Sequence, residues 1–160
     1  DTLPSRGLGD VYKRQFHITA PAEDGIGAKL AMENALKDSN LNTDQIDHIN
    51  AHGTSTPLGD IVESKAIRDV FKNDADSILV SSTKSMTGHL LGAAGAIESI
   101  YSIFAINNNL VPPTINLENP DNEANLDLVS NTSKDKEIKS VMNNTFGFGG
   151  TNVSLIFSEF

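Results

Sequence analysis

The chain has 160 residues and a formal net charge of −9, from 21 acidic and 12 basic side chains. This length fits one domain, and a hydrophobic share of 38% suffices for a packed core. The share of charged residues, 21%, excludes a disordered polyelectrolyte. The acidic balance argues against nucleic-acid binding, which depends on Lys and Arg. The absence of cysteine excludes disulfides, thiolate zinc sites and a cysteine nucleophile within this chain, and it fits a reducing cytoplasm.

The first 15 residues differ from the rest. Residues 1–15 show neither helix nor strand periodicity, and they lack the apolar stretch of a signal peptide. We interpret them as an artefactual leader, such as a cloning or assembly scar, and assign the folded domain to residues 16–160. A native disordered arm is the alternative.

Strands and helices alternate from Phe16 onward. A β-like run over 16–20 ends at Pro21, and a helix with apolar residues at helical spacing then runs to Asn40. Residues 46–51 are typical of a buried strand.

The next helix begins at Thr56 and Pro57, an N-cap residue followed by proline at the first helical position. A short buried strand over 78–80 follows this helix. Apolar residues at helical spacing predict the helix's buried face: Leu58, Val62, Ala66, Val70 and Phe71.

A long helix is predicted from about His89 to Asn107, followed by an extended surface connection over 107–127 that contains three prolines. Two β-like runs, 138–143 and 152–157, are joined by a glycine-rich turn. Strands that alternate with helices predict an α/β layered domain with a largely buried sheet.

The apolar stretch 88–106 is long enough to span a bilayer. However, Glu98 lies at its middle, next to Ser99 and Ser102, and a central acidic residue costs on the order of a few kcal/mol in lipid. We therefore interpret the stretch as a helix packed closely on a soluble sheet.

The first candidate motif is NAHGTSTPLGD at residues 50–60. It places His52 at the end of a buried strand, where α/β folds bind ligands, and Gly53 lets another group approach the backbone closely. Thr54 and Thr56 add two hydroxyls. On its own, the motif fits a helix-capping loop with a structural histidine equally well.

The second motif, SSTKSMTGH, spans residues 81–89 between a strand and a helix. His89 would lie near the positive end of that helix, which disfavours imidazolium, and the Lys84 ammonium would act in the same direction. A neutral imidazole can donate a hydrogen bond to developing negative charge. The alternative is a helix cap with an incidental histidine, and the absence of GxxxxGK[ST] disfavours a phosphate loop.

The third motif, NTFGFGGTN, spans residues 144–152. Its glycines allow positive φ and close backbone approach. GxGxxG is not satisfied, because Asn152 occupies the last position, so a dinucleotide site is not supported. The alternative is a tight hairpin turn.

Together with VPPTINLENP and the full stretch SSTKSMTGHLLGAAGAIES, these motifs resemble the signature stretches of β-ketoacyl-[acyl-carrier-protein] synthases, most closely of the synthase II type that elongates fatty acids. The four stretches occur in the family's order over about 16–157. The resemblance implies a thiolase-like fold of two α/β halves, with residues 16–160 forming a C-terminal half that is incomplete at its N-terminus.

The resemblance implies decarboxylative Claisen condensation of malonyl-ACP with acyl-ACP, in which a cysteine of the N-terminal half carries the acyl group. His52 and His89 match the two catalytic histidines, whose N–H groups would meet the thioester oxygen as it becomes an enolate. Preorganised donors of this kind contribute ~2.7–4 kcal/mol each. Lys84 matches the lysine that orients the second histidine, and Glu98 is its expected partner.

Further roles are implied for the loop residues. Phe148 matches a gating phenylalanine whose N–H completes a second oxyanion hole. Thr54 and Thr56 match the pair that binds the pantetheine arm, and Thr19 is expected to line the same tunnel. The glycines of the two loops are expected to contact substrate or to support the loop backbone: Gly147 for substrate, and Gly53 and Gly149 for support.

The resemblance also implies the kind of primer. Initiating synthases and plant-type chalcone synthases show a Cys-His-Asn pattern, so the second histidine, His89, implies primers carried by acyl carrier protein rather than by coenzyme A. His17 and His48 match no catalytic position and are interpreted as structural or surface residues, and Asp60 is expected to serve the helix dipole and local hydrogen bonds. No metal is expected, because His52 and His89 lack a third ligand at recognisable spacing. No cofactor is expected beyond the phosphopantetheine arm that acyl carrier protein delivers.

Without a cysteine, this chain alone is predicted to be inactive. The full-length enzyme is expected to be a cytoplasmic homodimer whose partner is acyl carrier protein. Three alternatives stay open: a polyketide-type ketosynthase, a non-catalytic partner such as a chain-length factor, and an α/β interaction module with structural histidines.

Overall fold

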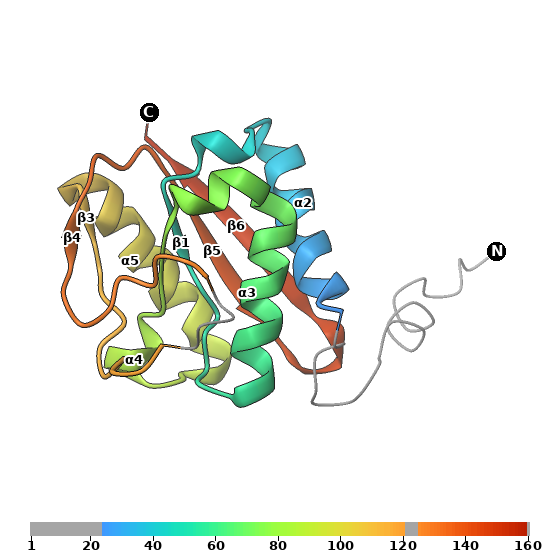
Figure 1. Cartoon of the computed structure of the whole chain (residues 1–160). Coiled ribbons are helices and arrows are strands. Elements are labelled where there is room, and N and C mark those ends of the chain that lie inside the picture. Colours follow the sequence, from blue (N-terminus) through green and yellow to red (C-terminus); the bar gives the residue numbers. More distant parts are fainter. Residues whose placement is uncertain (1–23, 121–124, 160) are drawn as a thin grey trace.

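The computed structural model describes residues 24–120 and 125–159 (Figure 1). The predicted strand over 16–20, the leader 1–15, Thr19 and His17 lie outside the described residues, so these predictions remain open.

A four-stranded mixed sheet forms the centre of the domain, in the order β2, β1, β5, β6. Strand β1 is parallel to both of its neighbours, whereas β6 runs antiparallel to β5. The strands span His48–Asn50 (β1), Leu79–Ser81 (β2), Ser140–Phe146 (β5) and Asn152–Ser158 (β6). The predicted strands are confirmed to within a few residues, and so is the predicted α/β fold class with a mixed sheet.

Helices cover both faces of this sheet (Figure 1). Helices α2 (Ile26–Ser39) and α3 (Pro57–Phe71) pack on one face, where the side chains of Ile49 and Met142 join their core. Helix α5 (Ala94–Asn108) lies on the opposite face, where Val141 belongs to a second core. Alternation along β5 therefore sends neighbouring side chains into two different layers.

The predicted ends of the first two helices are confirmed. Helix α2 stops at Asn40, which adopts a left-handed conformation, and α3 starts at Pro57 with Thr56 at the N-cap position. The predicted buried face of α3 holds except at Leu58, which is 44% exposed. Leu58 lies in the first turn, whereas the buried residues of α3 begin only at Val62.

The prediction of one long helix from His89 is wrong at its start. A short helix α4 (Lys84–Thr87) ends at Gly88 (φ 75°), and after a 3₁₀ turn α5 begins at Ala94. His89 therefore lies in a connection rather than at the start of α5, and the helix-dipole argument for its charge state loses its basis. Within the described residues, no helix has the length and apolar character needed to cross a membrane.

The connection over 107–127 is less irregular than predicted, because it contains β3 (Leu110–Val111), which pairs antiparallel with β4 (Lys134–Asp135). Two-residue strands are too short to give a periodic signal. The predicted turn between β5 and β6 is confirmed, and the Gly147 N–H closes it by donating to the Thr151 carbonyl at 2.8 Å.

Candidate active site

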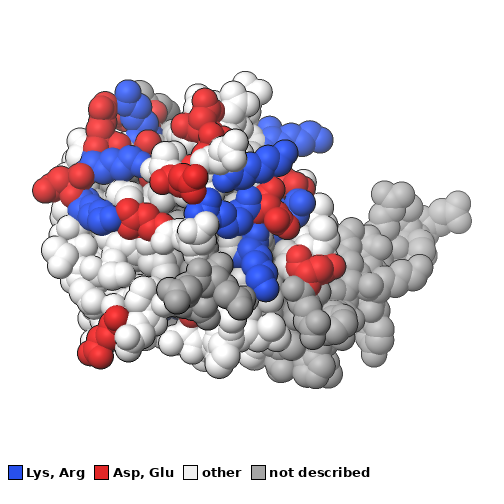
Figure 2. All heavy atoms as spheres, viewed as in Figure 1, with Lys and Arg blue, Asp and Glu red and all other residues white. Residues whose placement is uncertain are grey.

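The three candidate motifs all follow the carboxyl ends of adjacent parallel strands. His52 follows β1, Lys84 follows β2, and the Phe148 loop follows β5, each at the same edge of the sheet. Ligand sites of α/β folds lie at such edges. Figure 2 shows the charged side chains of the viewed face concentrated in its upper part, whereas the lower part, where α4 and the start of α3 lie, carries few of them.

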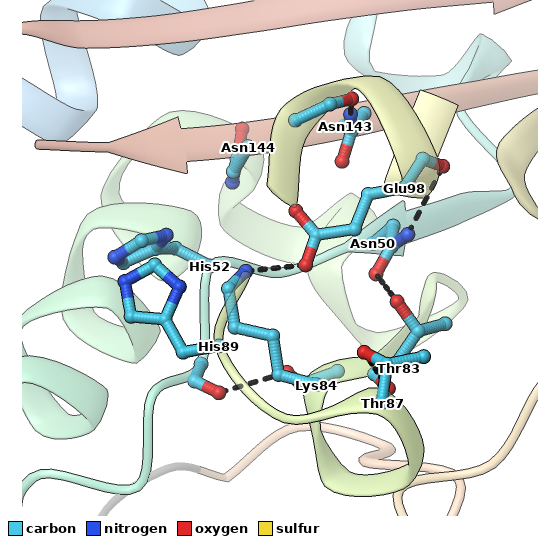
Figure 3. A network of polar contacts seen from close by, with 12 residues as sticks. Asn50, His52, Thr83, Lys84, Thr87, His89, Glu98, Asn143 and Asn144 are labelled. Atoms are coloured by element: carbon cyan, nitrogen blue, oxygen red, sulfur yellow. Dashed lines mark hydrogen bonds and ion pairs between the residues drawn. The ribbon is translucent and has the colours of Figure 1, made fainter. Parts of the chain in front are cut away.

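His52 and His89 lie next to each other (Figure 3), with ring centroids 5.5 Å apart and ring planes at 89°. The backbone N–H of Leu91 donates to His89 Nδ1 at 3.3 Å. Because Nδ1 accepts this bond, a neutral His89 carries its proton on Nε2. His89 is solvent-exposed, so this N–H can meet a ligand.

His52 is held neutral at pH 7. Burial, with smaller effects from the charges of Lys84 and His89, lowers the pKa of His52 to about 4. Its Nδ1 is buried and has no hydrogen-bond partner within the described residues. The ring of Phe146 lies against it, with centroids 5.8 Å apart. Sequence reasoning missed Phe146, although its position two residues before Phe148 was a usable signal.

The predicted partnership of Lys84 with Glu98 is confirmed. The Lys84 Nζ lies 2.5 Å from the Glu98 Oε1, and the two side chains are only 4% and 1% exposed (Figure 3). Burial raises the pKa of Glu98, and the Lys84 ammonium opposes that shift. The pair fixes a positive charge beside the two imidazoles.

Helix α5 turns polar side chains toward the sheet around this pair. The Glu98 carbonyl accepts hydrogen bonds from Ser102 Oγ at 2.8 Å and Asn50 Nδ2 at 3.4 Å. Asn143 Nδ2 donates to Ser99 Oγ at 3.3 Å. The four-residue spacing of Glu98 and Ser102 was the only sequence signal for this layer. Within the described residues, no three His, Asp or Glu side chains gather as a potential metal site.

A cavity of about 640 Å³ opens beside the two histidine-bearing loops. The hydroxyl oxygens of Thr54 and Thr56 lie 3.4 Å apart in this region. The Asp60 carboxylate accepts the Ser55 N–H at 3.1 Å, so the expected local hydrogen bond of Asp60 is confirmed. The polar lining includes Thr54, Thr56, Asp60, Ser82, Lys84, His89 and Asn116.

The glycine-rich loop presents Phe148 to solvent, with 74% of its surface exposed. Gly149 has φ 73°, a left-handed conformation that favours glycine, and a Cβ on Gly147 would lie 3.1 Å from the Thr151 carbonyl oxygen. These two observations explain why glycine occupies positions 147 and 149. The gating role of Phe148 and the substrate role of Gly147 stay predictions.

Two histidines and a buried lysine thus lie together at the carboxyl edge of a layered α/β domain. Residues 8–118 match the family described as "Beta-ketoacyl synthase, C-terminal domain", and the chain belongs to this family. The interpretation of residues 1–15 as an artefactual leader stays a prediction.

Curated relatives agree with this membership. The chain is 50% identical over 151 residues to the 3-oxoacyl-[acyl-carrier-protein] synthase 2 of Coxiella burnetii, and 52% identical over 145 residues to that of Synechocystis. These alignments cover 94% and 91% of this chain but only 36% and 35% of the relatives. The chain therefore spans about a third of their length.

Solved structures share the fold. A β-ketoacyl synthase from Burkholderia phymatum has a TM-score of 0.84 at 39% identity, and the ishigamide ketosynthase/chain length factor has 0.85 at 37%. Each comparison covers 91% of this chain and 35% of the other chain. The predicted thiolase-like half is confirmed.

Proposed function

We propose that the chain is the C-terminal part of a 3-oxoacyl-ACP synthase that elongates fatty acids by condensing malonyl-ACP with acyl-ACP. The observation that carries this proposal is the juxtaposition of His52 and His89, perpendicular and 5.5 Å apart, beside the buried Lys84–Glu98 pair. Two N–H donors that approach one point from different directions suit an oxygen on which negative charge develops.

In the proposed reaction, the bond between the malonyl α-carbon and its carboxylate breaks, and CO₂ leaves. The electron pair moves onto the thioester carbonyl, and the resulting enolate oxygen accepts hydrogen bonds from His52 and from Nε2–H of His89. The enolate carbon then attacks an acyl thioester carried by a cysteine, forming a carbon–carbon bond and releasing the thiolate. This chain contains no cysteine, so an upstream part must supply it.

The residues around the histidines support this role. Lys84 lies close enough to lower the pKa of His52, and its positive charge also favours the enolate electrostatically. Because Glu98 fixes the ammonium in place, that stabilisation needs no rearrangement during the reaction.

The substrate enters this proposal as a pantetheine thioester. The Thr54 and Thr56 hydroxyls would bind its arm, Phe148 would gate access, and no other cofactor is needed. The carrier-protein partner is supported by a structural relative at 36% identity, a type II PKS acyl-carrier protein in complex with its ketosynthase. A homodimeric assembly and a cytoplasmic location belong to the same proposal.

A polyketide-type ketosynthase and a chain-length factor are less favoured. The structural relative that combines a ketosynthase and a chain length factor is 37% identical, against 50% for the Coxiella burnetii synthase. A non-catalytic partner has no need of His52, Lys84 and His89 together, and all three are present and adjacent.

The test uses a chimera in which residues 16–160 replace the matching part of the Coxiella burnetii synthase. His52→Ala and His89→Ala are each expected to lower the rate of CO₂ release from malonyl-ACP by roughly 10²–10³-fold. Lys139→Ala, a change at an exposed side chain, is the control and should leave the rate unchanged. Wild-type CO₂ release in both histidine variants would refute the proposal.

A further inference from the structure

The VPPTIN motif has no part in the proposed reaction, yet it lies against the start of α4. Two of its residues contact that segment directly. The Thr114 Oγ1 accepts the backbone N–H of Ser82 at 3.0 Å, and the Ile115 N–H donates to Ser85 Oγ, also at 3.0 Å. These two contacts lie on either side of Lys84 along the chain.

The short stretch between the two contacts is also closed on itself. Ser85 Oγ, which accepts the Ile115 N–H, donates to the Ser82 carbonyl at 2.8 Å. Ser82 is only 7% exposed, so the Thr114 hydroxyl meets a donor that solvent barely reaches. Because a buried backbone N–H without an acceptor is unfavourable, this hydroxyl fixes the point at which the chain enters α4.

Thr114 is itself held in place through its backbone. Its N–H donates to the Val129 carbonyl at 2.9 Å, and its carbonyl accepts the Asn131 N–H, also at 2.9 Å. Val129 is fully buried and has φ 45°, a left-handed conformation that a β-branched residue rarely adopts. Such strain persists only where the surrounding structure imposes it, which indicates that the position of Thr114 is tightly determined.

Ser82 connects this contact to the loop that carries the first histidine. Its Oγ donates to the Gly53 carbonyl at 2.8 Å, while its N–H donates to Thr114. Lys84 follows two residues later, and its ammonium lies close enough to His52 to lower the pKa of that ring (Figure 3). The place of the ammonium therefore depends on where the backbone of Ser82 is anchored.

We propose that Thr114 is a positioning residue for Lys84: its hydroxyl anchors the backbone at the start of α4 and so holds the Lys84 ammonium beside the two imidazoles. The consequence for catalysis rests on the proposed function, whereas the placement of the ammonium does not. Thr114 also lines the cavity, so a direct contact with substrate is the competing role. Loss of a substrate contact would change KM, whereas a displaced ammonium would change kcat and the pKa of His52.

The experiment compares Thr114→Val with Thr114→Ser in the chimera described above. Valine keeps the shape of threonine but cannot accept the Ser82 N–H, whereas serine keeps the hydroxyl. Thr114→Val is expected to lower kcat for CO₂ release from malonyl-ACP by roughly tenfold or more with little change in KM, because small displacements in a site lower the rate steeply. Thr114→Ser should keep the wild-type kcat.

The pKa of His52, followed by ¹⁵N NMR of its ring in the same chimera, is the second readout. In Thr114→Val it should rise above the wild-type value of about 4, because the ammonium that lowers it moves away. Thr114→Ser should leave it unchanged, and so should Thr132→Val, the control at an exposed threonine. If Thr114→Val does not fold, Thr114→Ala, which also lacks the acceptor, is measured instead, and the same two changes are expected.

Two results would overturn the proposal. If folded Thr114→Val loses stability in urea but keeps the wild-type kcat and the wild-type pKa of His52, Thr114 is structural only. If its KM rises while kcat stays unchanged, Thr114 contacts substrate and does not position Lys84.

The variant His52→Ala separates this inference from the function beneath it. If His52→Ala abolishes CO₂ release while Thr114→Val behaves as wild type, the positioning claim alone fails. If His52→Ala has no effect on CO₂ release, the proposed function fails, and the pKa of His52 in Thr114→Val alone decides the positioning claim.

Discussion

Lys84 and Glu98 form an ion pair that solvent barely reaches, with side chains 4% and 1% exposed. Glu98 is contributed by α5, whereas Lys84 is the first residue of the short helix α4. Removing one partner of such a pair leaves an uncompensated buried charge, which is strongly destabilising.

Lys84→Ala is therefore expected to lower the free energy of unfolding of the chain by about 3–5 kcal/mol. The exposed pair of Lys139 and Glu137, 3.3 Å apart with side chains 67% and 75% exposed, is the control. Lys139→Ala should cost no more than about 1 kcal/mol. Urea denaturation measures both, and equal values for the two variants would show that the buried pair is not formed.

His48 predicts a pH dependence of stability. Its Nδ1–H donates to the Leu79 carbonyl at 2.9 Å, and burial lowers its pKa to about 4, against 6.5 in the unfolded chain. As the pH falls below 6.5, the unfolded state takes up the proton first, so this residue's contribution to stability decreases until the pH reaches the folded pKa. The shift of the pKa from 6.5 to about 4 corresponds to a full loss of about 3 kcal/mol in the free energy of unfolding.

The measurement compares the wild-type chain with His48→Asn by denaturant unfolding between pH 7.5 and 4, roughly spanning the two pKa values. An asparagine amide can still donate to the Leu79 carbonyl but does not titrate. The wild type should therefore lose stability relative to the variant as the pH falls. Parallel stability curves for the two proteins would contradict the assignment of His48 as a buried neutral imidazole.

Gly53 has a steric reason to be glycine. A Cβ there would lie 2.7 Å from the Ser82 Cβ, and its φ of 34° disfavours other residues. Gly53→Ala is expected to destabilise the chain by about 1–3 kcal/mol. Gly92, whose Cβ would meet no atom within 4 Å, provides the control, and Gly92→Ala should stay within about 0.5 kcal/mol of wild type.

Thermal unfolding measures both glycine variants. Combining Gly53→Ala with Ser82→Gly should recover part of the loss, because it removes the side chain that the new Cβ meets. If the double variant is no more stable than Gly53→Ala alone, the close contact is not the cause.

Much of this fold could be predicted because local signals agreed with the final packing. The Thr56–Pro57 start of α3 and the Asn40 end of α2 depend on backbone geometry that the residues themselves favour. The start of α5 could not be predicted in the same way. The glycines before it allow a turn at Gly88, and whether the chain turns there depends on packing against the sheet.

The direction in which the side chains of α5 point is a second feature that could not be predicted from the sequence. Periodicity places apolar residues toward the core, yet α5 buries Glu98 and Ser102 and leaves Phe104 56% exposed. The individual roles of His52, His89 and Lys84 came from motif resemblance, whereas the contact of Phe146 with the His52 ring became visible only in the structure. Phe146 lies in the third motif, two residues before Phe148, but the motif alone does not show that its ring faces His52.

His52 is a neutral imidazole that lies directly beside the ring of His89. Titration of the histidine ring nitrogens by ¹⁵N NMR, with each ring assigned, tests it directly. The pKa of His52 should be about 4, and its ring should show a nuclear Overhauser effect to the ring of His89. A pKa of His52 near 6.5, without a contact between the two rings, would show that His52 is neither buried as a neutral imidazole nor adjacent to His89.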